Sequence, residues 1–382
     1  MMFLAPRLSF FYIAIFCVIG CMMPFWPVWL QARGMNGAEI GILTATPVLG
    51  KVIFSPLFAS LGDKLGERKR LLMLFLATSF CFFALFYITH NFYLLLMISF
   101  LYGISWAPIM SFGDNITILA TRAGKIQYGR LRLWGSVSFI LMSFGFGFVL
   151  QHQTDDLIYW TILAAIGLTF LASLLLPDVQ VMPLGPAGRP VRTLLKNRTF
   201  QIFMASVACI HGSHALYYAF ATLHWRTQGY SDAFIGFLWA EGVVAEVVFF
   251  IFGDRIGQNF SAAGLLILAA TACIVRWTVL GSDPHVIVLC IVQTLHALTF
   301  GAMHLGAMNF ISRTVSVDLS VTAQSLYGAS AFGVGGGVTL LFVGYFYELF
   351  AGEAFFIMTL MGIFGTIFGL MLRQRKNCLI PA

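Results

Sequence analysis

GDKLGERKR, residues 62–70, is a short polar stretch that separates two long apolar runs, 40–60 and 71–90. Each run has about 20 residues, which at ~1.5 Å per residue in a helix is enough to cross a ~30 Å hydrocarbon core. Lys and Arg dominate the polar stretch, as is typical of cytoplasmic turns. The sequence here predicts two membrane-spanning helices joined by a tight basic turn.

The same alternation of apolar runs and short polar breaks extends through all 382 residues. Hydrophobic side chains make up 59% of the chain and charged ones 10%, which excludes an ordinary soluble domain. The expected helices lie near residues 8–32, 40–60, 71–90, 93–120, 131–151, 157–176, 199–225, 233–253, 261–281, 285–312, 321–347 and 354–373. We therefore predict an all-α membrane protein with twelve transmembrane helices. The first run is too long for the core of a signal peptide and is expected to remain as the first helix.

Basic residues are concentrated in every second polar break between the apolar runs. Of the 22 Lys and Arg residues, all but Arg33, Lys51, Arg226 and Arg276 fall in the termini or in breaks after even-numbered runs. Cytoplasmic loops retain positive charge, so we expect both termini in the cytoplasm and the protein in the inner (plasma) membrane. This asymmetry accounts for the net charge of +7, and no nucleic-acid partner is expected.

The longest break, residues 177–197, is rich in Pro and Gly and is expected to be a cytoplasmic linker. It divides the chain into an N-terminal six-helix bundle, 1–176, and a C-terminal six-helix bundle with a short tail, 198–382. The bundle domains are expected to be related by pseudo-symmetry, because the two halves share a pattern of residues.

This internal repeat has the same residue types at nearly constant spacing. The matched residues are Trp29, Gly34, Ile40, Gly41 and Leu43 against Trp225, Gly229, Ile235, Gly236 and Leu238. The basic turns that follow also match, with residues 63–66 corresponding to residues 254–257. Twofold repeats of six helices are typical of transporters that work by rocking of two bundles.

Five ionisable side chains lie inside the apolar runs: Lys51, Asp114, Glu241, Glu246 and Arg276. A charge at membrane depth costs at least about 2.5 to 3.5 kcal/mol, so such residues usually face a protein-lined cavity and have a function there. The hypothesis that follows is a transporter with a polar, titratable core. No cofactor is expected, because the Walker pattern and metal-ligand spacing are absent.

Lys51 and Glu246 occupy equivalent depths in the two halves, each 11 residues after an Ile of the repeat, about 16 Å into the bilayer. If both face the cavity, Lys51 can bind a substrate carboxylate while Glu246 is protonated, and can pair with Glu246 when the site is empty. The alternative is a permanent buried ion pair that only holds the halves together.

The other candidate groups for proton coupling are Glu241, His214 and His296. Glu241 is five residues from Glu246, an angle of about 140° around a helix, so the two carboxylates cannot point the same way. The alternative role of Glu241 is a pair with Arg276, which is expected in the same outer half and is a second candidate for binding substrate. Intramembrane His residues near a Glu are suited to proton relay, and a metal site is not favoured.

Aromatic and inner-end residues complete the set of candidates. Trp26, Tyr218 and Trp239 are candidates for stacking on a substrate ring, although helix packing explains most membrane Trp and Tyr residues. Asp114 and Arg132 lie near the cytoplasmic face, where we expect a structural pair that stabilises an inner gate.

Residues 62–69 resemble the signature between helices 2 and 3 of the major facilitator superfamily, with a weaker echo at Asp254. The resemblance implies that this turn controls a cytoplasmic gate, with an acidic side chain meeting a helix N-terminus and basic side chains holding the gate closed. The gating residues it implies are Asp63, Lys64, Gly66, Arg68, Asp254 and Arg255.

A narrower resemblance covers nearly the whole chain. It rests on residues 24–30 (PFWPVWL), 128–136 (YGRLRLWGS), 211–215 (HGSHA), 238–247, 275–277 (VRW) and 295–297 with His304. These segments resemble the phenylpropionate permease family, whose relatives include lactose permease and nucleoside/proton symporters. The resemblance implies proton-coupled uptake of a small aromatic carboxylate such as 3-phenylpropionate, by a monomer.

Other functions are less well supported. Nucleosides, sugars and siderophores remain alternative cargo, and a proton/drug antiporter would also have an aromatic cavity with membrane carboxylates. An enzyme is not expected, because no nucleophile or metal constellation has convincing spacing. A sensor would usually carry a cytoplasmic output domain, and the tail after Leu372 is only ten residues long.

Overall fold

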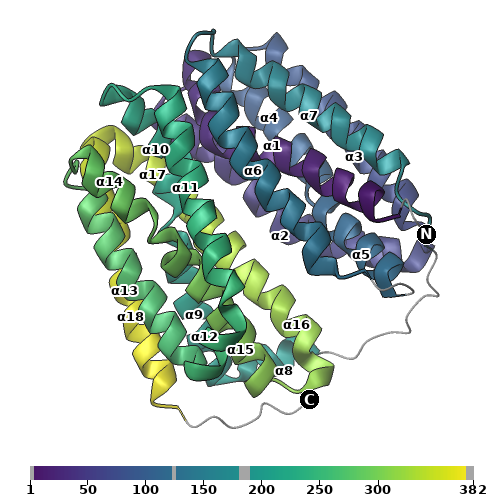
Figure 1. The fold of residues 1–382 in the computed structure, drawn as a ribbon, viewed down its shortest axis with the longest axis vertical. Helices are drawn as coiled ribbons and strands as arrows, with labels where there is room; N and C mark the ends of the chain where they lie inside the picture. Colours follow the sequence, from purple (N-terminus) through teal and green to yellow (C-terminus); the bar gives the residue numbers. More distant parts are fainter. Residues whose placement is uncertain (1–3, 123–125, 180–189, 376–382) are drawn as a thin grey trace. The chain divides into compact units, whose positions relative to one another are not determined.

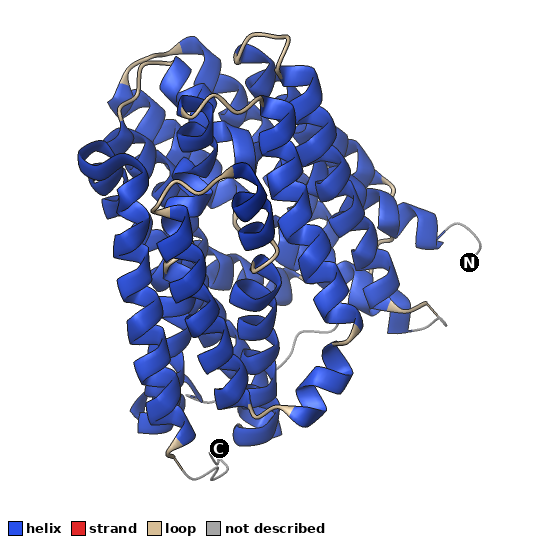
Figure 2. Cartoon of the chain, turned by 60° about the vertical axis from the view of Figure 1, so that its left-hand side comes forward, coloured by secondary structure: helices blue, strands red, loops and turns tan. Residues whose placement is uncertain are grey.

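The protein is described by a computed structural model that covers residues 4–122, 126–179 and 190–375. These residues form helices joined by short loops, and none of them is in a strand (Figure 2). The helices up to the central break are α1 Leu4–Ala32, α2 Gly37–Leu65, α3 Arg68–Ala84 with its extension η1 Leu85–Ile88, α4 Phe92–Trp106, α5 Ile109–Arg122, α6 Tyr128–Leu150 and α7 Asp156–Leu174 (Figure 1).

The second half contains more elements because several of its helices are interrupted. They are α8 Pro190–Lys196, α9 Arg198–Gly212, α10 Ala215–Thr227, α11 Asp232–Ile251, α12 Gly253–Asn259, α13 Ala262–Leu280, α14 Val286–Gln293, η2 Ala297–Ala302, α15 Met303–Thr314, α16 Val317–Gly328, η3 Ala329–Val338, α17 Thr339–Phe350, η4 Ala351–Ala354 and α18 Phe355–Arg373. The segments η2 and η3 are π-helical, a form that is rare and occurs frequently at functional sites.

The described helices make twelve membrane passes, as the sequence predicts. Ten helical runs are long and apolar enough to cross a membrane. One of them, Asp318–Arg373, is 56 residues long and reverses at Ala351, where φ is 46°, so it makes two passes. One further pass comes from α9 and α10 together, which are separated by a turn at residues 213–214.

The outer surfaces of the helices are apolar. Ile88, Leu141 and Ile251 are 75%, 67% and 72% exposed, and many other large hydrophobic side chains share this exposure. Such a surface would be unstable in water and suits contact with lipid. The fold is therefore an all-α membrane protein, as expected.

Contacts between helices group the chain into two compact units. Unit 1 comprises Met1–Gly185 and Ala221–Ala240, and unit 2 comprises Pro186–Phe220 and Glu241–Ala382. In unit 1, α1 packs against α6 and α7, and in unit 2, α13 packs against α18. Helices α10 and α11 are each divided between the two units. The corner between them, residues 221–240, belongs with unit 1, and the rest of both helices belongs with unit 2.

The internal repeat is visible in the backbone of two helix corners. Gly34 and Gly229 both have left-handed φ values, 87° and 84°. The backbone N–H of the residue after each glycine donates to a carbonyl in the last turn of the preceding helix. Met35 donates to Leu30 and Tyr230 to Trp225, both at 3.1 Å. This is the pattern of a glycine-terminated helix, and it explains why the repeat keeps glycine at both positions.

The basic turn after α2 also depends on glycine. Gly66 ends the helix at φ 71°, and its N–H donates to the Gly62 carbonyl at 2.9 Å. A Cβ at Gly62 would lie 2.4 Å from the ring of Phe112, so only glycine permits this packing. The corresponding Gly257 lies inside α12 instead, so the second copy of the turn is helical.

Candidate functional site

Arg276 lies at the centre of a buried polar cluster in unit 2. Its side chain is 0% exposed and comes from α13. Nη2 donates to Oε1 of Gln293 at 2.6 Å, and Nη1 lies 3.1 Å from Nδ1 of His296 and 3.3 Å from Oγ1 of Thr299. A buried charge requires such partners, because its desolvation is otherwise prohibitive.

The contact with Arg276 determines the protonation of His296. A guanidinium group only donates, so Nδ1 of His296 must accept, and the ring proton of the neutral imidazole is on Nε2. Nε2 lies 3.5 Å from Oε2 of Glu246, on α11. His296 thus connects the guanidinium of Arg276 to the carboxylate of Glu246.

A second branch of the cluster runs through Thr299 to His214. Nδ1 of His214 lies 3.0 Å from the Ile210 carbonyl, which only accepts, so Nδ1 carries the proton. Nε2 of His214 lies 3.0 Å from Oγ1 of Thr299, so His214 and Arg276 share this hydroxyl. Arg276 thus contacts both branches of the cluster and fixes the tautomer of His296.

Aromatic rings enclose the guanidinium of Arg276. Its Cζ lies 4.6 Å from the ring centre of Tyr217 and 4.9 Å from that of Trp277, distances suited to cation–π attraction. The indole of Trp277 donates to Oγ of Ser213 at 2.8 Å, which fixes this ring at the turn between α9 and α10.

The cluster lies where the helices of unit 2 are interrupted. His214 lies in the turn between α9 and α10, and Thr299 belongs to the π-helical η2. Gln293, His296 and Thr299 are spaced three residues apart on α14–η2, so they share one face and reach Arg276 together. Interrupted membrane helices are tolerated where they line a polar site, because side chains satisfy the freed backbone groups.

The two acidic residues of α11 differ in their contacts. Glu246 lies beside His296, whereas Oε2 of Glu241 is buried and has no hydrogen-bond partner among the described residues. The expected pairing of Glu241 with Arg276 is absent among the described residues, where Arg276 contacts Gln293, His296, Thr299 and two aromatic rings. This separation agrees with the angle of about 140° between positions five residues apart.

His211, Tyr218 and His304 surround the cluster on its other sides. The ring of Tyr218 stacks on His214 at 5.7 Å, and the ring of His211 contacts Phe332 at 4.4 Å. Nδ1 of His304 lies 3.1 Å from the hydroxyl of Tyr327, so His304 is held apart from His296 by its own partner. Among the described residues, no group of three or more His, Cys, Asp or Glu side chains could hold a metal ion.

In unit 1, Asp114 is held by two tyrosines. Its Oδ1 accepts from the hydroxyls of Tyr12 at 2.7 Å and Tyr128 at 2.9 Å. The expected ion pair with Arg132 is absent among the described residues, and Arg132 lies over the ring of Phe16 at 4.1 Å. Two phenol donors on one oxygen satisfy this carboxylate, which makes no direct ion pair among the described residues.

Lys51 lies on α2, also in unit 1. The face of α2 that carries Pro47, Lys51 and Ser55 meets α4, where Pro47 touches Gly103 and Ser55 donates to the Ala107 carbonyl at 3.0 Å. The Lys51 side chain itself is exposed, makes no direct ion pair with the described residues of unit 1, and lies within electrostatic range of Asp114. Its role in binding substrate stays a prediction.

The remaining candidates for ring binding are packed against protein. Trp26 is 7% exposed and stacks on Trp29 with ring centres 4.7 Å apart. Trp239 is 3% exposed and donates to Oγ1 of Thr222 at 3.0 Å. In this conformation both rings belong to the packed interior of unit 1.

The candidate gate residues are only partly described. The side chains of Asp63 and Lys64 lie outside the described residues, while Gly66 shapes the turn and Arg68 is buried at 6% exposure. Asp254 and Arg255 are exposed in the first turn of α12. Arg313 and Asn309 anchor this segment by donating to the Gly257 carbonyl at 2.9 and 3.2 Å.

Sequence reasoning missed two members of the cluster, Gln293 and Thr299. A signal for both was present, because they are polar and lie three residues to either side of His296 in an apolar run. Tyr217 could be foreseen as an aromatic residue able to stack on a ring, but its position beside Arg276 depends on the turn after α9.

Comparisons with known proteins show the family to which the chain belongs. A family model described as "MFS_1 like family" matches residues 6–358. The chain is 28% identical over 361 residues to a "Probable 3-phenylpropionic acid transporter" of Escherichia coli (strain K12), a match that covers 92% of this chain and 93% of that protein. It is 25% identical over 333 residues to "Lactose permease" of Citrobacter freundii, covering 80% and 78% of the two chains.

A solved structure has the same fold. The crystal structure of the nucleoside transporter NupG superposes with a TM-score of 0.84 and 15% sequence identity, covering 98% of this chain and all of that one. At this identity the likeness establishes the fold alone. The relatives from Escherichia coli and Citrobacter freundii bear the names of transporters rather than enzymes, which confirms the expectation from the sequence.

Proposed function

The chain belongs to the MFS_1 like family and is a transporter of the major facilitator superfamily, and from this premise we propose that it carries out proton-coupled uptake of a small aromatic carboxylate. The proposed substrate is 3-phenylpropionate or a close analogue. Its relative in Escherichia coli bears the name of a probable transporter of that acid.

The observation that carries the proposal is the connection from Arg276 through His296 to Glu246. When Glu246 is ionised, it balances the buried guanidinium through the imidazole. When Glu246 takes up a proton, Arg276 lacks a counter-charge, and a substrate carboxylate can supply it. Proton binding and substrate binding then favour one another, which is the coupling that symport requires.

The chemistry around Arg276 suits an aromatic carboxylate. Guanidinium groups bind carboxylates through two parallel hydrogen bonds, and Arg276 is flanked by aromatic rings on which a phenyl group can pack. Because Arg276 is fully buried in this conformation, substrate must displace Gln293 or His296 to reach it. The π-helical η2 directly after His296 supplies a segment whose hydrogen bonds can rearrange.

We further propose that the ends of the helices bearing the two termini face the cytoplasm. The support is the concentration of Lys and Arg in the breaks at that end. The corners after α1, α6 and α10 then face outward. Lys51 is proposed as a second cation for the substrate carboxylate.

Uptake into proteoliposomes tests the proposal. Purified protein is reconstituted with an alkaline lumen, and initial uptake of labelled 3-phenylpropionate, uridine, lactose and a quinolone is compared with and without a protonophore. The undissociated acid crosses lipid unaided, so protein-free liposomes give the background. We expect 3-phenylpropionate uptake above that background, abolished by the protonophore.

The same panel decides against the proposal if another solute is carried. Gradient-dependent uptake of uridine or lactose without 3-phenylpropionate uptake would identify a nucleoside or sugar importer. Extrusion of the quinolone from preloaded vesicles under an opposite gradient would identify a drug antiporter.

A further inference from the structure

Two adjacent carboxylates, Asp155 and Asp156, lie at the start of α7 in unit 1. Each binds an arginine from a different helix corner, Asp156 from the corner after α1 and Asp155 from the corner after α10. These are the two corners that the internal repeat relates. The pair of carboxylates therefore gathers two equivalent corners at the end of the molecule that we propose faces outward.

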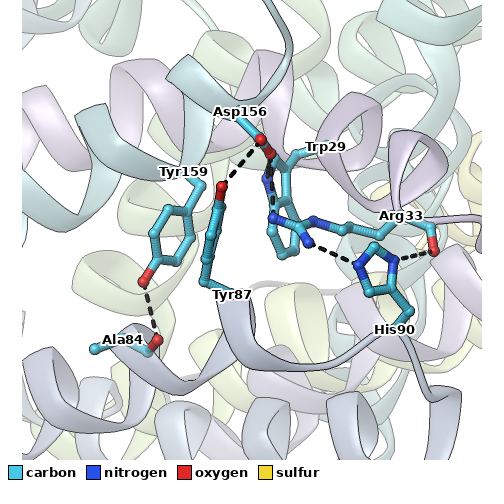
Figure 3. Close-up of polar contacts among 7 residues, drawn as sticks. All are labelled: Trp29, Arg33, Ala84, Tyr87, His90, Asp156 and Tyr159. Atoms are coloured by element: carbon cyan, nitrogen blue, oxygen red, sulfur yellow. Dashed lines mark hydrogen bonds and ion pairs between the residues drawn. The ribbon is translucent and has the colours of Figure 1, made fainter.

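The contact of Asp156 with Arg33 is heavily reinforced (Figure 3). Nη2 of Arg33 lies 3.1 Å from Oδ1 of Asp156, and the same carboxylate accepts from Nε1 of Trp29 at 3.3 Å and the hydroxyl of Tyr87 at 3.2 Å. The guanidinium lies between the rings of Trp29 and Tyr87, at 4.6 and 4.3 Å from their centres. His90 adds a further contact with Nη1, at 2.9 Å.

The contact of Asp155 with Arg226 is a single bond. Nη2 of Arg226 lies 2.9 Å from Oδ1 of Asp155. The same guanidinium binds Asp232, at the start of α11, through Nε at 2.6 Å and Nη2 at 2.8 Å. Arg226 thus makes its two-point contact within its own corner and only one ionic contact with α7.

Glycines allow this corner to lie directly on α6. A Cβ at Gly147 would lie 2.3 Å from the carbonyl oxygen of Asp232, and one at Gly236 would lie 2.2 Å from that of Ser143. No real Cβ tolerates such distances, so any side chain at either glycine would push α11 away from α6. Small residues at a crossing are the usual means of close helix approach in membranes, and here Gly147 of α6 and Gly236 of α11 serve that purpose.

We propose that the Arg226–Asp155 bond is a releasable outer latch, and that the cluster of Asp156 with Arg33, Trp29 and Tyr87 is its fixed anchor. Release of the latch frees the α10–α11 corner from α7 and lets α11 leave α6. The outer end of unit 1 then opens without disturbing the anchor.

The contacts of Arg226 explain why release is easy. When Arg226 leaves Asp155, it keeps both hydrogen bonds to Asp232, so its charge stays paired. Asp155 is 32% exposed and regains water, and ion pairs of this exposure contribute little net stability. Residues 221–240 group with unit 1, whereas the rest of α10 and α11 groups with unit 2, so the latch holds the part of these two helices that belongs to unit 1.

Cysteine labelling tests the latch without any substrate. Ser143 is 0% exposed beneath Gly236, so a Ser143→Cys reporter is protected while the crossing of α6 and α11 is closed. In a background without the native cysteines, its labelling by a membrane-impermeant maleimide is followed in vesicles. We expect Asp155→Asn to raise the labelling rate several-fold, because it removes the latch and leaves Arg226 paired with Asp232.

Matched variants separate release of the latch from general loosening. Gly147→Val should also raise labelling, whereas Gly145→Val, two residues away on α6 with no atom near its Cβ position, should not. Asp156→Asn should lower the melting temperature without raising labelling. The proposal is overturned if the Ser143→Cys reporter is labelled at the parental rate in the Asp155→Asn variant. Labelling at the parental rate in the Gly147→Val variant would overturn it as well. Neither outcome depends on the proposed substrate, so the proposed uptake stands or fails separately.

Discussion

Nη1 of Arg276 lies 3.1 Å from Nδ1 of His296, and this contact orders the whole buried cluster. Because arginine cannot accept a hydrogen bond, it forces His296 to present its N–H toward Glu246. A proton on Nδ1 would break the contact. A proton on Glu246 would leave it intact but remove the negative charge that balances Arg276, so protonation of Glu246 is the step that prepares Arg276 for an anion.

The geometry of the Arg276 guanidinium should be essential. In Arg276→Lys, the charge is kept, but one ammonium cannot reach Gln293, His296 and Thr299 together. We expect initial uptake to fall by at least about tenfold, as for the loss of a group that holds substrate in place. Arg192→Lys, an exposed exchange of the same kind on α8, is the matched control. Uptake that survives Arg276→Lys would place the anion site elsewhere.

The hydroxyl of Thr299 should matter through both branches of the cluster. Thr299→Val keeps the shape of the side chain but removes an acceptor for Arg276 and the hydrogen-bond partner of Nε2 of His214. A buried polar atom left without a partner, here Nε2 of His214, costs about 1 to 3 kcal/mol, so we expect weaker substrate binding and a raised KM. Thr294→Val, in the turn between α14 and η2 with an exposed side chain, should leave KM unchanged. Equal KM values in both variants would remove His214 from the site.

Lys51 provides a test of a role inferred from the sequence alone. Lys51→Met keeps the length of the side chain and removes its charge at the middle of α2. If Lys51 helps to hold the substrate carboxylate, KM should rise by about tenfold or more, the effect of losing one charge-assisted contact. The control is Lys196→Met, an exposed lysine of α8. Transport kinetics that match the wild type would assign Lys51 to the protein surface only.

Gly66 should be required for stability rather than chemistry. Its φ of 71° lies in the left-handed region, where an L-residue with a side chain costs about 1 to 2 kcal/mol. We expect Gly66→Ala to lower the melting temperature of the purified protein. Gly129→Ala, at an open position near the start of α6, should not. Equal melting temperatures would mean that the turn adopts another conformation.

Much of the fold could be predicted because the length and apolar composition of membrane helices identify them in a sequence. The apolar runs located all twelve passes, and Gly34 and Gly229 marked the repeated corners. The interruptions were harder to foresee. The turn at residues 213–214 and the π-helical η2 lie inside single predicted helices, 199–225 and 285–312, where buried polar side chains compensate the displaced backbone bonds.

The candidate site was predictable in its residues more than in its contacts. Arg276, His296, His214 and Glu246 stood out as charged or titratable groups in apolar runs, and they lie in one cluster. Their partners depend on rotation about each helix, which hydropathy does not specify. For the same reason Asp114, expected beside Arg132, is held by Tyr12 and Tyr128.

Proton coupling through Glu246 is the central claim, and Glu246→Gln tests it most directly. The measurement compares exchange of labelled 3-phenylpropionate across liposomes at equal pH with its accumulation under a pH gradient, each corrected with protein-free liposomes. Glu353→Gln, an exposed change of the same kind in η4, is the control, and Glu241→Gln tests the other carboxylate of α11. We predict that Glu246→Gln keeps exchange and loses accumulation, because its neutral amide mimics the protonated state. Accumulation at the wild-type level in Glu246→Gln would contradict the claim, and its loss in Glu241→Gln alone would transfer the proton to Glu241.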